Sequence, residues 1–258
     1  LEKFDKGRKT PKKQTTKMTL NIPLKTTFAA AAVTAGLALS ASAAITFSSS
    51  EVNTATDGDL SVTNQNASVN DGLDPIVIDG STNKGVGQSF LMGGTAGYLN
   101  AVTLKLKSTA TNDYSGLGTH SFEIRVGTFT GDYASFNVVS AQTVTGDLSG
   151  LVNGDFITWT LNSQVALAAG TTYGAIVNGL DTGGARFDLA KNTGYGDGRV
   201  LYQNYNDWTT TPVLQGLGNN SGRDANFHMD ISSTAVPEPT TTALLGLGGL
   251  ALILRRRK

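Results

Sequence analysis

The sequence contains no cysteine among its 258 residues, and it contains only two histidines. Without cysteine the chain cannot form disulfides, thiolate metal sites or a cysteine nucleophile. His120 and His228 are little material for a histidine metal site or for the base of a catalytic triad. The stretch between 44 and 236 also lacks a G-x-S-x-G nucleophile elbow. We therefore expect both histidines to lie on the surface or on a strand face, without a catalytic role.

The formal net charge is zero, but positive and negative residues are segregated along the chain. Residues 1–43 carry eight Lys or Arg and two acidic residues, and the last four residues are all basic. Residues 44–236 carry eight basic and 17 acidic residues, a net charge of −9. An acidic body repels a phosphate backbone, so nucleic acid is excluded as a partner.

Residues 44–236 contain no apolar stripe of three helical turns. They contain short runs in which apolar and polar residues alternate. The clearest runs are 98–107 and 120–129. Alternation with period two predicts half-buried antiparallel strands. In the first run, Val102, Leu104 and Leu106 form one face, and Thr103, Lys105 and Lys107 form the other. In the second run, Phe122, Ile124 and Val126 are predicted inward, and Glu123 and Arg125 outward.

Further strand-like runs are separated by Gly, Asn and Asp turn signals, which predict an all-β fold. We expect one antiparallel β-sandwich over 44–234, jelly-roll-like in its connections. Residues 44–84 are more polar, and we expect an opening hairpin or a looser arm there. The further strands are predicted at 45–49, 59–63, 75–79, 86–92, 136–144, 155–161, 165–168, 171–178, 185–189, 199–203 and 225–231. The turn signals include Gly146-Asp147, Asn153-Gly154 and Asp197-Gly198.

The N-terminal region reads as a secretory signal over 18–43, with Met18 as the start. Residues 1–17 are polar and basic, and we interpret them as a gene-start artefact or an extended n-region. The apolar run 28–39 precedes Ala41-Ser42-Ala43, so signal peptidase is expected to cleave after Ala43 and leave Ala44 first. The alternative is a permanent anchor, for which about 12 apolar residues are short.

The C-terminal region contains a Pro-Glu-Pro spacer, an apolar segment and a basic end. The prolines hold an extended spacer. The apolar segment 241–254 spans about 21 Å as a helix, short of a bilayer core of ~30 Å. The alternative of a buried core helix fits poorly with apolar residues on all sides and a basic stop. The motif residues are Val236, Pro237, Glu238, Pro239, Arg255, Arg256 and Arg257.

These C-terminal residues resemble the PEP-CTERM sorting signal of Gram-negative bacteria. The resemblance implies recognition of Pro237, Glu238 and Pro239 by exosortase, an integral-membrane transpeptidase of the cysteine type. It implies a sorting tail over 235–258 and a precursor anchored in the inner membrane. The mature protein is then expected on the cell surface or in the extracellular matrix.

The body resembles, over 85–231, the secreted β-sandwich modules called choice-of-anchor ectodomains. The resemblance rests on Val86-Gly-Gln-Ser-Phe90, 98–104, Phe122-Glu-Ile-Arg-Val126 and 167–177. These modules occur with several alternative C-terminal anchors and have no assigned activity. The resemblance therefore implies a fold and no chemistry.

An aromatic cluster lies within fourteen residues, among Asn, Gln and Asp side chains. Flat aromatic faces with amides and carboxylates nearby are typical of sugar binding, so an exopolysaccharide is a candidate partner. The alternative is that Tyr202 and Trp208 bury their rings and cap the edge of the sandwich. Trp159 is expected to be an ordinary strand residue. The members of the cluster are Tyr195, Tyr202, Tyr205 and Trp208.

Nearly all carboxylates lie in turns, where aspartate commonly accepts hydrogen bonds from its own backbone. A structural Ca²⁺ is one interpretation, because turn loops supply hard oxygen ligands, and solvated turns are the other. A secreted glycoside hydrolase would need two convergent carboxylates, which spacing alone does not indicate. We expect no cofactor and no catalytic residue, and an exported non-enzymatic protein. The calcium candidates are Asp57, Asp59, Asp71 and Asp74.

Overall fold

A computed structural model describes ten stretches of the chain, all within one compact unit, Ala38–Lys258. They are 43–52, 58–66, 71–72, 76–78, 84–110, 112–130, 135–181, 185–192, 194–204 and 224–235. These stretches are all-β, and none of their segments is a helix long and apolar enough to cross a membrane. The helices predicted near 28–39 and at 241–254 lie outside the described residues.

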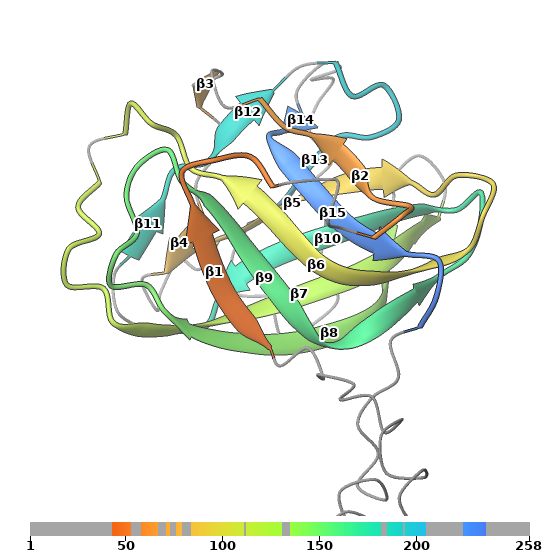
Figure 1. Ribbon diagram of the computed structural model, residues 1–258, viewed down its shortest axis with the longest axis horizontal. Helices are drawn as coiled ribbons and strands as arrows, with labels where there is room; N and C mark the ends of the chain where they lie inside the picture. Colours follow the sequence, from red (N-terminus) through yellow and green to blue (C-terminus); the bar gives the residue numbers. More distant parts are fainter. Residues whose placement is uncertain are drawn as a thin grey trace, which may run out of the picture. The chain divides into compact units, whose positions relative to one another are not determined.

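One antiparallel sheet has five strands in the order β1-β9-β6-β15-β2 (Figure 1). The first part of the body supplies both of its edges, because β1 pairs with β9 and β2 pairs with β15. The strands β1 and β2 therefore both belong to this sheet and do not pair with each other. The strands are β1 (Ala44–Ser48), β2 (Val62–Asn64), β6 (Gly97–Lys105), β9 (Phe156–Leu167) and β15 (Phe227–Ser232).

A second antiparallel sheet has seven strands in the order β11-β4-β5-β10-β7-β8, with β13 also paired to β5. A small sheet, β14-β12-β3, lies beside them. The large sheet contains β4 (Ile76–Ile78), β5 (Lys84–Leu91), β7 (Thr119–Thr130), β8 (Ser135–Asp147), β10 (Thr172–Gly179), β11 (Ala185–Phe187) and β13 (Val200–Asn204). The small sheet contains β3 (Asp71–Gly72), β12 (Ala190–Asn192) and β14 (Asp224–Ala225).

The two large sheets pack face to face around one apolar core, an arrangement that fits a β-sandwich. Trp159 of β9 and Phe122 of β7 meet edge to face across this core, with ring centroids 5.5 Å apart. Burial of the apolar face of each strand drives this packing, and the period-two pattern supplies that face. The inward prediction for Phe122, Ile124 and Val126 is confirmed. Trp159 is a fully buried strand residue, as expected.

Several predicted strands change their limits in the structure. The runs 155–161 and 165–168 join into the single strand β9. The turn predicted at Gly146-Asp147 is wrong, because both residues lie in β8, opposite His120 and Thr119. The short strands β3 and β12 had no alternating pattern long enough to be recognised. Short bridging strands form through contacts with distant segments, which a local pattern does not report.

The polar face of β6 is buried, and this corrects the prediction of a half-exposed strand. Lys105 is 2% exposed, and its ammonium lies 5.7 Å from the centre of the Phe156 ring. The same ammonium donates to the carbonyl oxygen of Asn66 at 3.4 Å. Burial lowers the pKa of Lys105 below 10.5, and the nearby Glu51 carboxylate partly opposes this. Chain segments that precede β6 therefore cover this part of the sheet.

Replacing Lys105 by methionine is expected to raise the free energy of unfolding at neutral pH, by up to about 4 kcal/mol. Methionine keeps an apolar stem against Phe156 and removes a buried charge. Between the lowered pKa and 10.5 the unfolded chain binds more protons than the native chain. The stability of the parent chain therefore rises with pH through this window, and K105M should flatten the rise. Urea unfolding at pH values from about 7 to about 11 measures both effects.

Lys107→Met is the matched control, since Lys107 lies two residues along the chain and is only half-buried. This variant should keep the pH profile of the parent chain. If the stability of K105M still rises with pH as that of the parent chain does, the rise does not come from Lys105.

The edge strand β8 is partly closed by side chains. The Gln142 amide donates to the carbonyl of Ser163 at 2.8 Å and accepts from its N–H at 3.0 Å. The Asn162 amide donates to the carbonyl of Thr143 at 2.7 Å. Nearer the start of β8, the register with β7 shifts at Val126 and Gly127 and leaves Val139 unmatched. Hydrogen bonds to β9 therefore occupy the edge of β8 at 142–143, and the bulge interrupts it at Val139.

Candidate functional site

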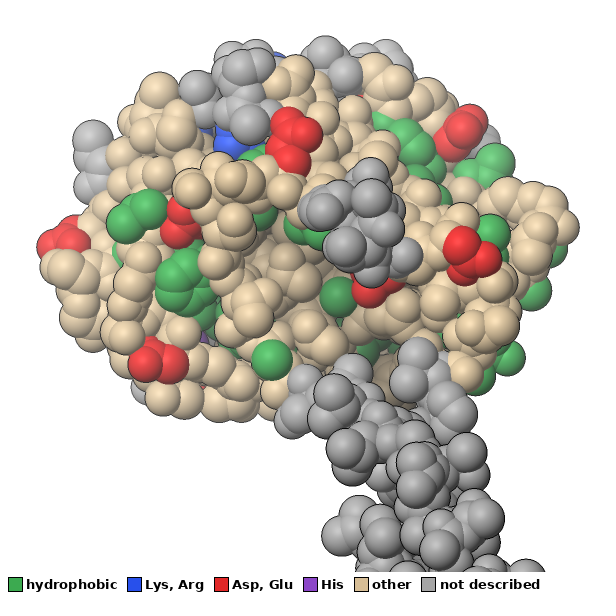
Figure 2. Space-filling model, in the orientation of Figure 1, with side chains coloured by type: hydrophobic (Ala, Val, Ile, Leu, Met, Phe, Trp, Pro, Cys, Tyr) green, Lys and Arg blue, Asp and Glu red, His purple; other side chains and the backbone are tan. Residues whose placement is uncertain are grey.

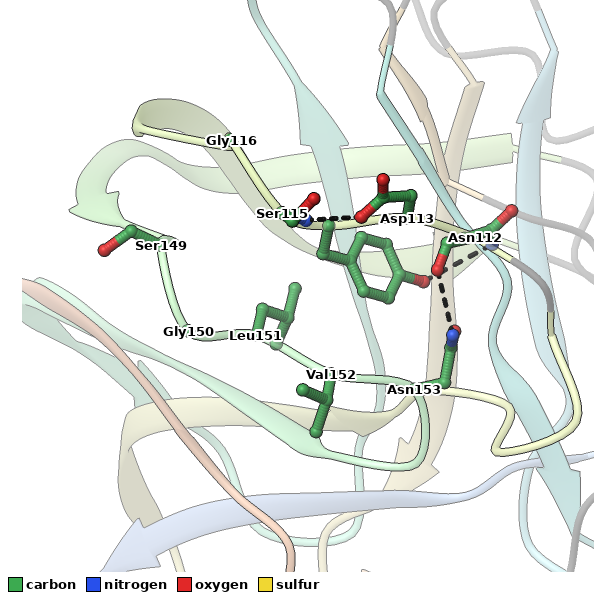
Figure 3. Close-up of a pocket in the computed structure, with 10 residues that line it drawn as sticks. Asn112, Asp113, Ser115, Gly116, Ser149, Gly150, Leu151, Val152 and Asn153 are labelled. Atoms are coloured by element: carbon green, nitrogen blue, oxygen red, sulfur yellow. Dashed lines mark hydrogen bonds between the residues drawn. The ribbon is translucent and has the colours of Figure 1, made fainter.

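A groove of about 510 Å³ lies between two loops, 112–116 and 149–153 (Figure 3). The first loop connects β6 to β7, and the second connects β8 to β9. Both loops bring small and polar residues to the groove, with glycine at 116 and 150. Gly116 has a φ of +92°, a left-handed conformation that favours glycine in the turn after Ser115. We call this feature the loop groove.

Two asparagine side chains fix the first loop, one to the second loop and one to Asp188. The Asn153 amide donates to the carbonyl of Asn112 at 2.9 Å. The Asn112 amide in turn donates to a carboxylate oxygen of Asp188 at 2.8 Å. The first of these bonds joins the walls of the groove, as Figure 3 shows. The amide bond of Asn153 therefore joins the two loops, and the charge-assisted bond to Asp188 fixes the side chain of Asn112.

The carboxylate of Asp113 lies in the exposed part of the groove. Hydrogen bonds from the Ser115 hydroxyl and from the Ser115 N–H lower the pKa of Asp113 below 3.8. The N–H bond measures 2.8 Å. Asp113 is therefore ionised at neutral pH and accepts hydrogen bonds. It cannot serve as a general acid there, because that role requires a protonated carboxyl.

Tyr114 and Leu151 line the apolar part of the groove and belong to the core. The Tyr114 ring stacks on Phe187 with ring centroids 5.7 Å apart. Burial raises the pKa of the Tyr114 hydroxyl, which accepts a 3.4 Å hydrogen bond from Asn112. The side chain of Val152, in contrast, is 56% exposed. The groove thus offers both aliphatic surface and polar groups.

The loop groove lies at the end of the five-stranded sheet away from the C-terminal exit of the body. Lys105 pairs with Phe156 at the groove end, and Leu106 donates to the carbonyl of Asp155. Ser232 pairs with Tyr98 at the other end of β6. The distance from Tyr98 to Lys105 along the strand is about 24 Å, at roughly 3.4 Å per residue.

The predicted aromatic cluster is described only in part. Tyr195 is half-buried, and its ring packs edge to face on Phe227 with centroids 5.1 Å apart. Its hydroxyl accepts the N–H of Leu91 at 3.2 Å. Tyr195 is therefore part of the packing of the fold. Tyr202 has its backbone in β13, and Tyr205 and Trp208 lie outside the described residues.

A carboxylate beside Tyr195 is buried and was missed by the search of the sequence. Asp224 accepts the Gln88 amide at 3.0 Å and the Tyr195 N–H at 3.2 Å. Burial raises the pKa of Asp224, and these two hydrogen bonds oppose the rise. Gln88 also accepts the N–H of Ala225 at 2.8 Å. Asp224 and Gln88 therefore form a hydrogen-bonded pair at the edge of the core.

The predicted calcium residues do not meet in the described stretches. Asp59 accepts the N–H of Ser233 at 2.7 Å, and hydrogen bonds from the Ser233 hydroxyl and N–H lower the pKa of Asp59. The backbone of Asp71 lies in β3, whereas Asp57 and Asp74 are outside the described residues. No group of three or more possible metal ligands occurs within the stretches that the structure describes. For Asp59, the solvated-turn interpretation agrees with its contacts.

Both histidines lie on strands. His120 is the second residue of β7 and contacts Asp181, with Nδ1 3.2 Å from a carboxylate oxygen. The same oxygen accepts the N–H of Ser121 at 2.6 Å, so Asp181 fixes the start of the strand. His228 lies in β15 and is 1% exposed. Neither residue lines the loop groove.

The candidate sorting and cleavage residues fall mostly outside the described stretches. Val236, Pro237, Glu238, Pro239 and Arg255–Arg257 lie there, and so does Ala41. Ala43 is described as irregular backbone, and Ala44 is the first residue of β1. The loop groove itself was missed by sequence reasoning. Its one signal was the Asn153-Gly154 turn, where Gly154 has a φ of +97°.

Comparison with known protein families identifies the C-terminal end of the chain. Residues 235–258 match the family model described as the PEP-CTERM protein-sorting motif. A comparison with curated proteins found no match. The matched residues contain the Pro-Glu-Pro spacer, the apolar segment and the basic end, in that order. The chain therefore carries a PEP-CTERM protein-sorting motif, which marks an exported protein that is sorted through this tail.

Proposed function

We propose that the chain is a non-enzymatic protein of the cell surface or the extracellular matrix. Its precursor is held in the inner membrane, and an exosortase-type enzyme recognises residues 235–258. The observation that carries this proposal is the sorting motif itself. Signal peptidase acts at the other end, after Ala43. The jelly-roll-like connectivity and the choice-of-anchor character of the body belong to the same proposal, supported by its two antiparallel sheets.

The limits of the folded body support processing at both ends. β1 begins at Ala44, and β15 ends at Ser232. Cleavage after Ala43 and recognition of Pro237 to Pro239 would both fall outside these paired strands. The sheet would therefore keep its hydrogen bonds through both steps.

The loop groove supports a non-enzymatic body. Its one carboxylate, Asp113, is ionised at neutral pH, and none of its ten lining residues is a histidine. Retaining and inverting glycosidases both need a protonated carboxyl beside a second carboxylate. The groove is thus suited to binding.

Replacing Glu238 by alanine is expected to leave export intact and to abolish surface sorting almost completely. Glu238 carries the only charge in the Pro-Glu-Pro spacer, and a cationic or donor group of the sorting enzyme would lose its partner. Fractionation of native cells, with surface labelling of intact cells, measures the displayed fraction. The precursor should accumulate in the inner membrane.

Thr241→Ala, a truncation just beyond the spacer that removes no charge, is the control and should be displayed normally. Normal display of the Glu238→Ala variant would refute the sorting mechanism. Retention of both variants in the cytoplasm would refute export.

A further inference from the structure

The strand that leads to the sorting tail leaves the body at one end, which we call the tail end. β15 ends there at Ser232, which pairs with Tyr98 near the start of β6. Loops 92–96 and 168–171 connect the two large sheets at the same end. Figure 1 shows β15 ending and β6 beginning on the same side of the molecule. The sorting motif at 235–258 therefore follows directly from the tail end.

The spacer between the body and the apolar segment limits how far the tail end can lie from a membrane. Residues 233–240 separate β15 from the predicted apolar segment 241–254. Fully extended, these eight residues span at most about 29 Å, at roughly 3.6 Å per residue. A tether of this length holds the bilayer surface at a high effective concentration, so that a weak contact is sufficient. This step rests on the proposed function, which places the apolar segment in the inner membrane.

Exposed large apolar side chains gather toward the tail end of the seven-stranded sheet. Leu91 is 38% exposed at the end of β5, and Val138 and Val139 are 40% and 54% exposed in the first half of β8. β8 begins at the tail end, because the end of β7 pairs with the start of β10 and with the start of β8. Within the stretches that the structure describes, the other such side chain is Val152, in the loop groove at the opposite end.

These side chains border an apolar cluster on the outer face of the seven-stranded sheet, separate from the core between the sheets. Phe129 and Phe136 pair across β7 and β8, with ring centroids 5.3 Å apart. Val138 shares their face, since it lies two residues after Phe136, and Leu91 points outward because Phe90 points into the core. An outer sheet face in water commonly carries polar side chains instead. The cluster members are Phe136, Ile176 and Leu201, with the partly buried Phe129 packed against them.

The loops at the tail end carry no charge. Residues 92–96 and 168–171 are Gly, Ala, Thr and Met only. Small uncharged side chains allow the backbone to approach a headgroup layer closely, without the cost of removing a charge from water. The charged residues described at the margins of this end are Asp59, Asp197, Arg199 and Asp230.

The rest of the body is acidic. Residues 44–236 carry a net charge of −9, and Figure 2 shows acidic side chains spread over one face with little basic surface. A bilayer that contains anionic lipids repels such surfaces. The tail end of the seven-stranded sheet is therefore the side of closest approach. The carboxylates described at the opposite end, near the loop groove, are Asp113, Asp147, Asp155, Asp181 and Asp188.

We propose that the tail end of the seven-stranded sheet rests on the bilayer surface while the chain is anchored, with Leu91 and Val138 at the level of the lipid headgroups. One weak membrane signal binds reversibly, whereas two signals in the same chain attach it stably. The sorting tail is the first signal, and this surface is the second. Once the tail is removed, the surface alone is too weak to hold the body, which then leaves the membrane.

Fluorescence from single labelled sites tests the proposal. The chain has no cysteine, so Val138→Cys and Val152→Cys each create one site for an NBD label. The labelled full-length chain is inserted into vesicles of phosphatidylethanolamine and phosphatidylglycerol. Spin-labelled lipids should quench the label at 138 at least about twofold more than the label at 152, and aqueous iodide should show the reverse order. Val152 is the matched control, because it is an exposed valine at the opposite end.

A charge substitution provides the second measurement. In a Leu91→Cys chain that carries the label, Val138→Glu adds a carboxylate to the same surface and should abolish most of the quenching by spin-labelled lipids. Val152→Glu adds the same charge at the opposite end and should leave the quenching unchanged. Val138 and Val152 are both exposed, so both variants should fold, and circular dichroism verifies this.

Equal lipid quenching at 138 and 152 would overturn the proposal, and so would unchanged quenching after Val138→Glu. Protection from iodide at 138 that grows with the number of chains per vesicle would assign the surface to a second copy and overturn it as well. Flotation with the vesicles reports insertion of the tail separately. A chain that floats without preferential quenching refutes the contact alone, whereas a chain that does not float refutes the anchored precursor too. Sorting of Glu238→Ala is measured in cells and depends on neither result.

Discussion

Replacing Gly87 by alanine is expected to lower the free energy of unfolding by about 3 kcal/mol or more. Gly87 lies in β5 between β10 and β13, opposite Ile176 and Leu201. A Cβ at this position would lie 1.8 Å from the carbonyl oxygen of Ala175 and 2.7 Å from the Cα of Ile176. Both are backbone atoms, so a side-chain rotation cannot relieve the overlap. The pairing of β5 with β10 would have to open.

Gly93→Ala is the matched control, because a Cβ there would meet no atom within 4 Å. It should change the stability by less than about 1 kcal/mol, and an alanine can even stabilise such a site through the unfolded chain. Urea unfolding of the full-length chain, followed by circular dichroism, compares the two. Equal stabilities for the two variants would mean that the close approach at Gly87 is absent.

Replacing Trp159 by alanine is expected to cost about 3–5 kcal/mol, since a large buried side chain leaves a cavity between the sheets. Trp159 is fully buried and contacts Phe122 edge to face. Its Nε1 donor is buried without a hydrogen-bond partner among the described residues. Phenylalanine removes this donor and keeps most of the apolar contact. Trp159→Phe should therefore cost less than half as much as Trp159→Ala.

The comparison of the two Trp159 variants separates packing from the buried donor. Both are measured by the same urea unfolding experiment, followed by circular dichroism. If Trp159→Phe costs as much as Trp159→Ala, the indole donor must have a partner that stabilises it. A Trp208→Phe variant is the control in the same experiment. It shows whether loss of an indole ring by itself changes the circular dichroism signal.

The strands were predictable where one face of a strand meets the core. Phe122, Ile124 and Val126 alternate with Glu123 and Arg125, and this local pattern reflects burial on one side only. β6 departs from it, because Lys105 contacts Asn66 and the ring of Phe156, both distant in the chain. Alternation reports the chemistry of the two faces, and it cannot report what later covers the polar one. The burial of Lys105 therefore could not be predicted from the residues around it in the sequence.

The loop groove was harder to foresee than the tail. Its two loops are separated by more than thirty residues, and the bond between Asn153 and Asn112 joins them only after β6, β7, β8 and β9 have paired. Tyr195 shows the same limit, since it lies between β12 and β13 and its partner Phe227 lies in β15, about thirty residues further along the chain. The sorting motif, in contrast, is read as a continuous sequence. It could be recognised without any folded contact.

The closed edge of β8 affects how copies of this protein behave when they are crowded. A long open edge with exposed valines offers a template on which a neighbouring chain can add a strand and start a fibre. Here the Thr143 carbonyl is occupied by Asn162, and Gln142 is bound to Ser163. The unmatched Val139 interrupts the regular ladder in the remaining part. At this edge, a neighbouring chain would therefore meet an interrupted template and not a straight ladder.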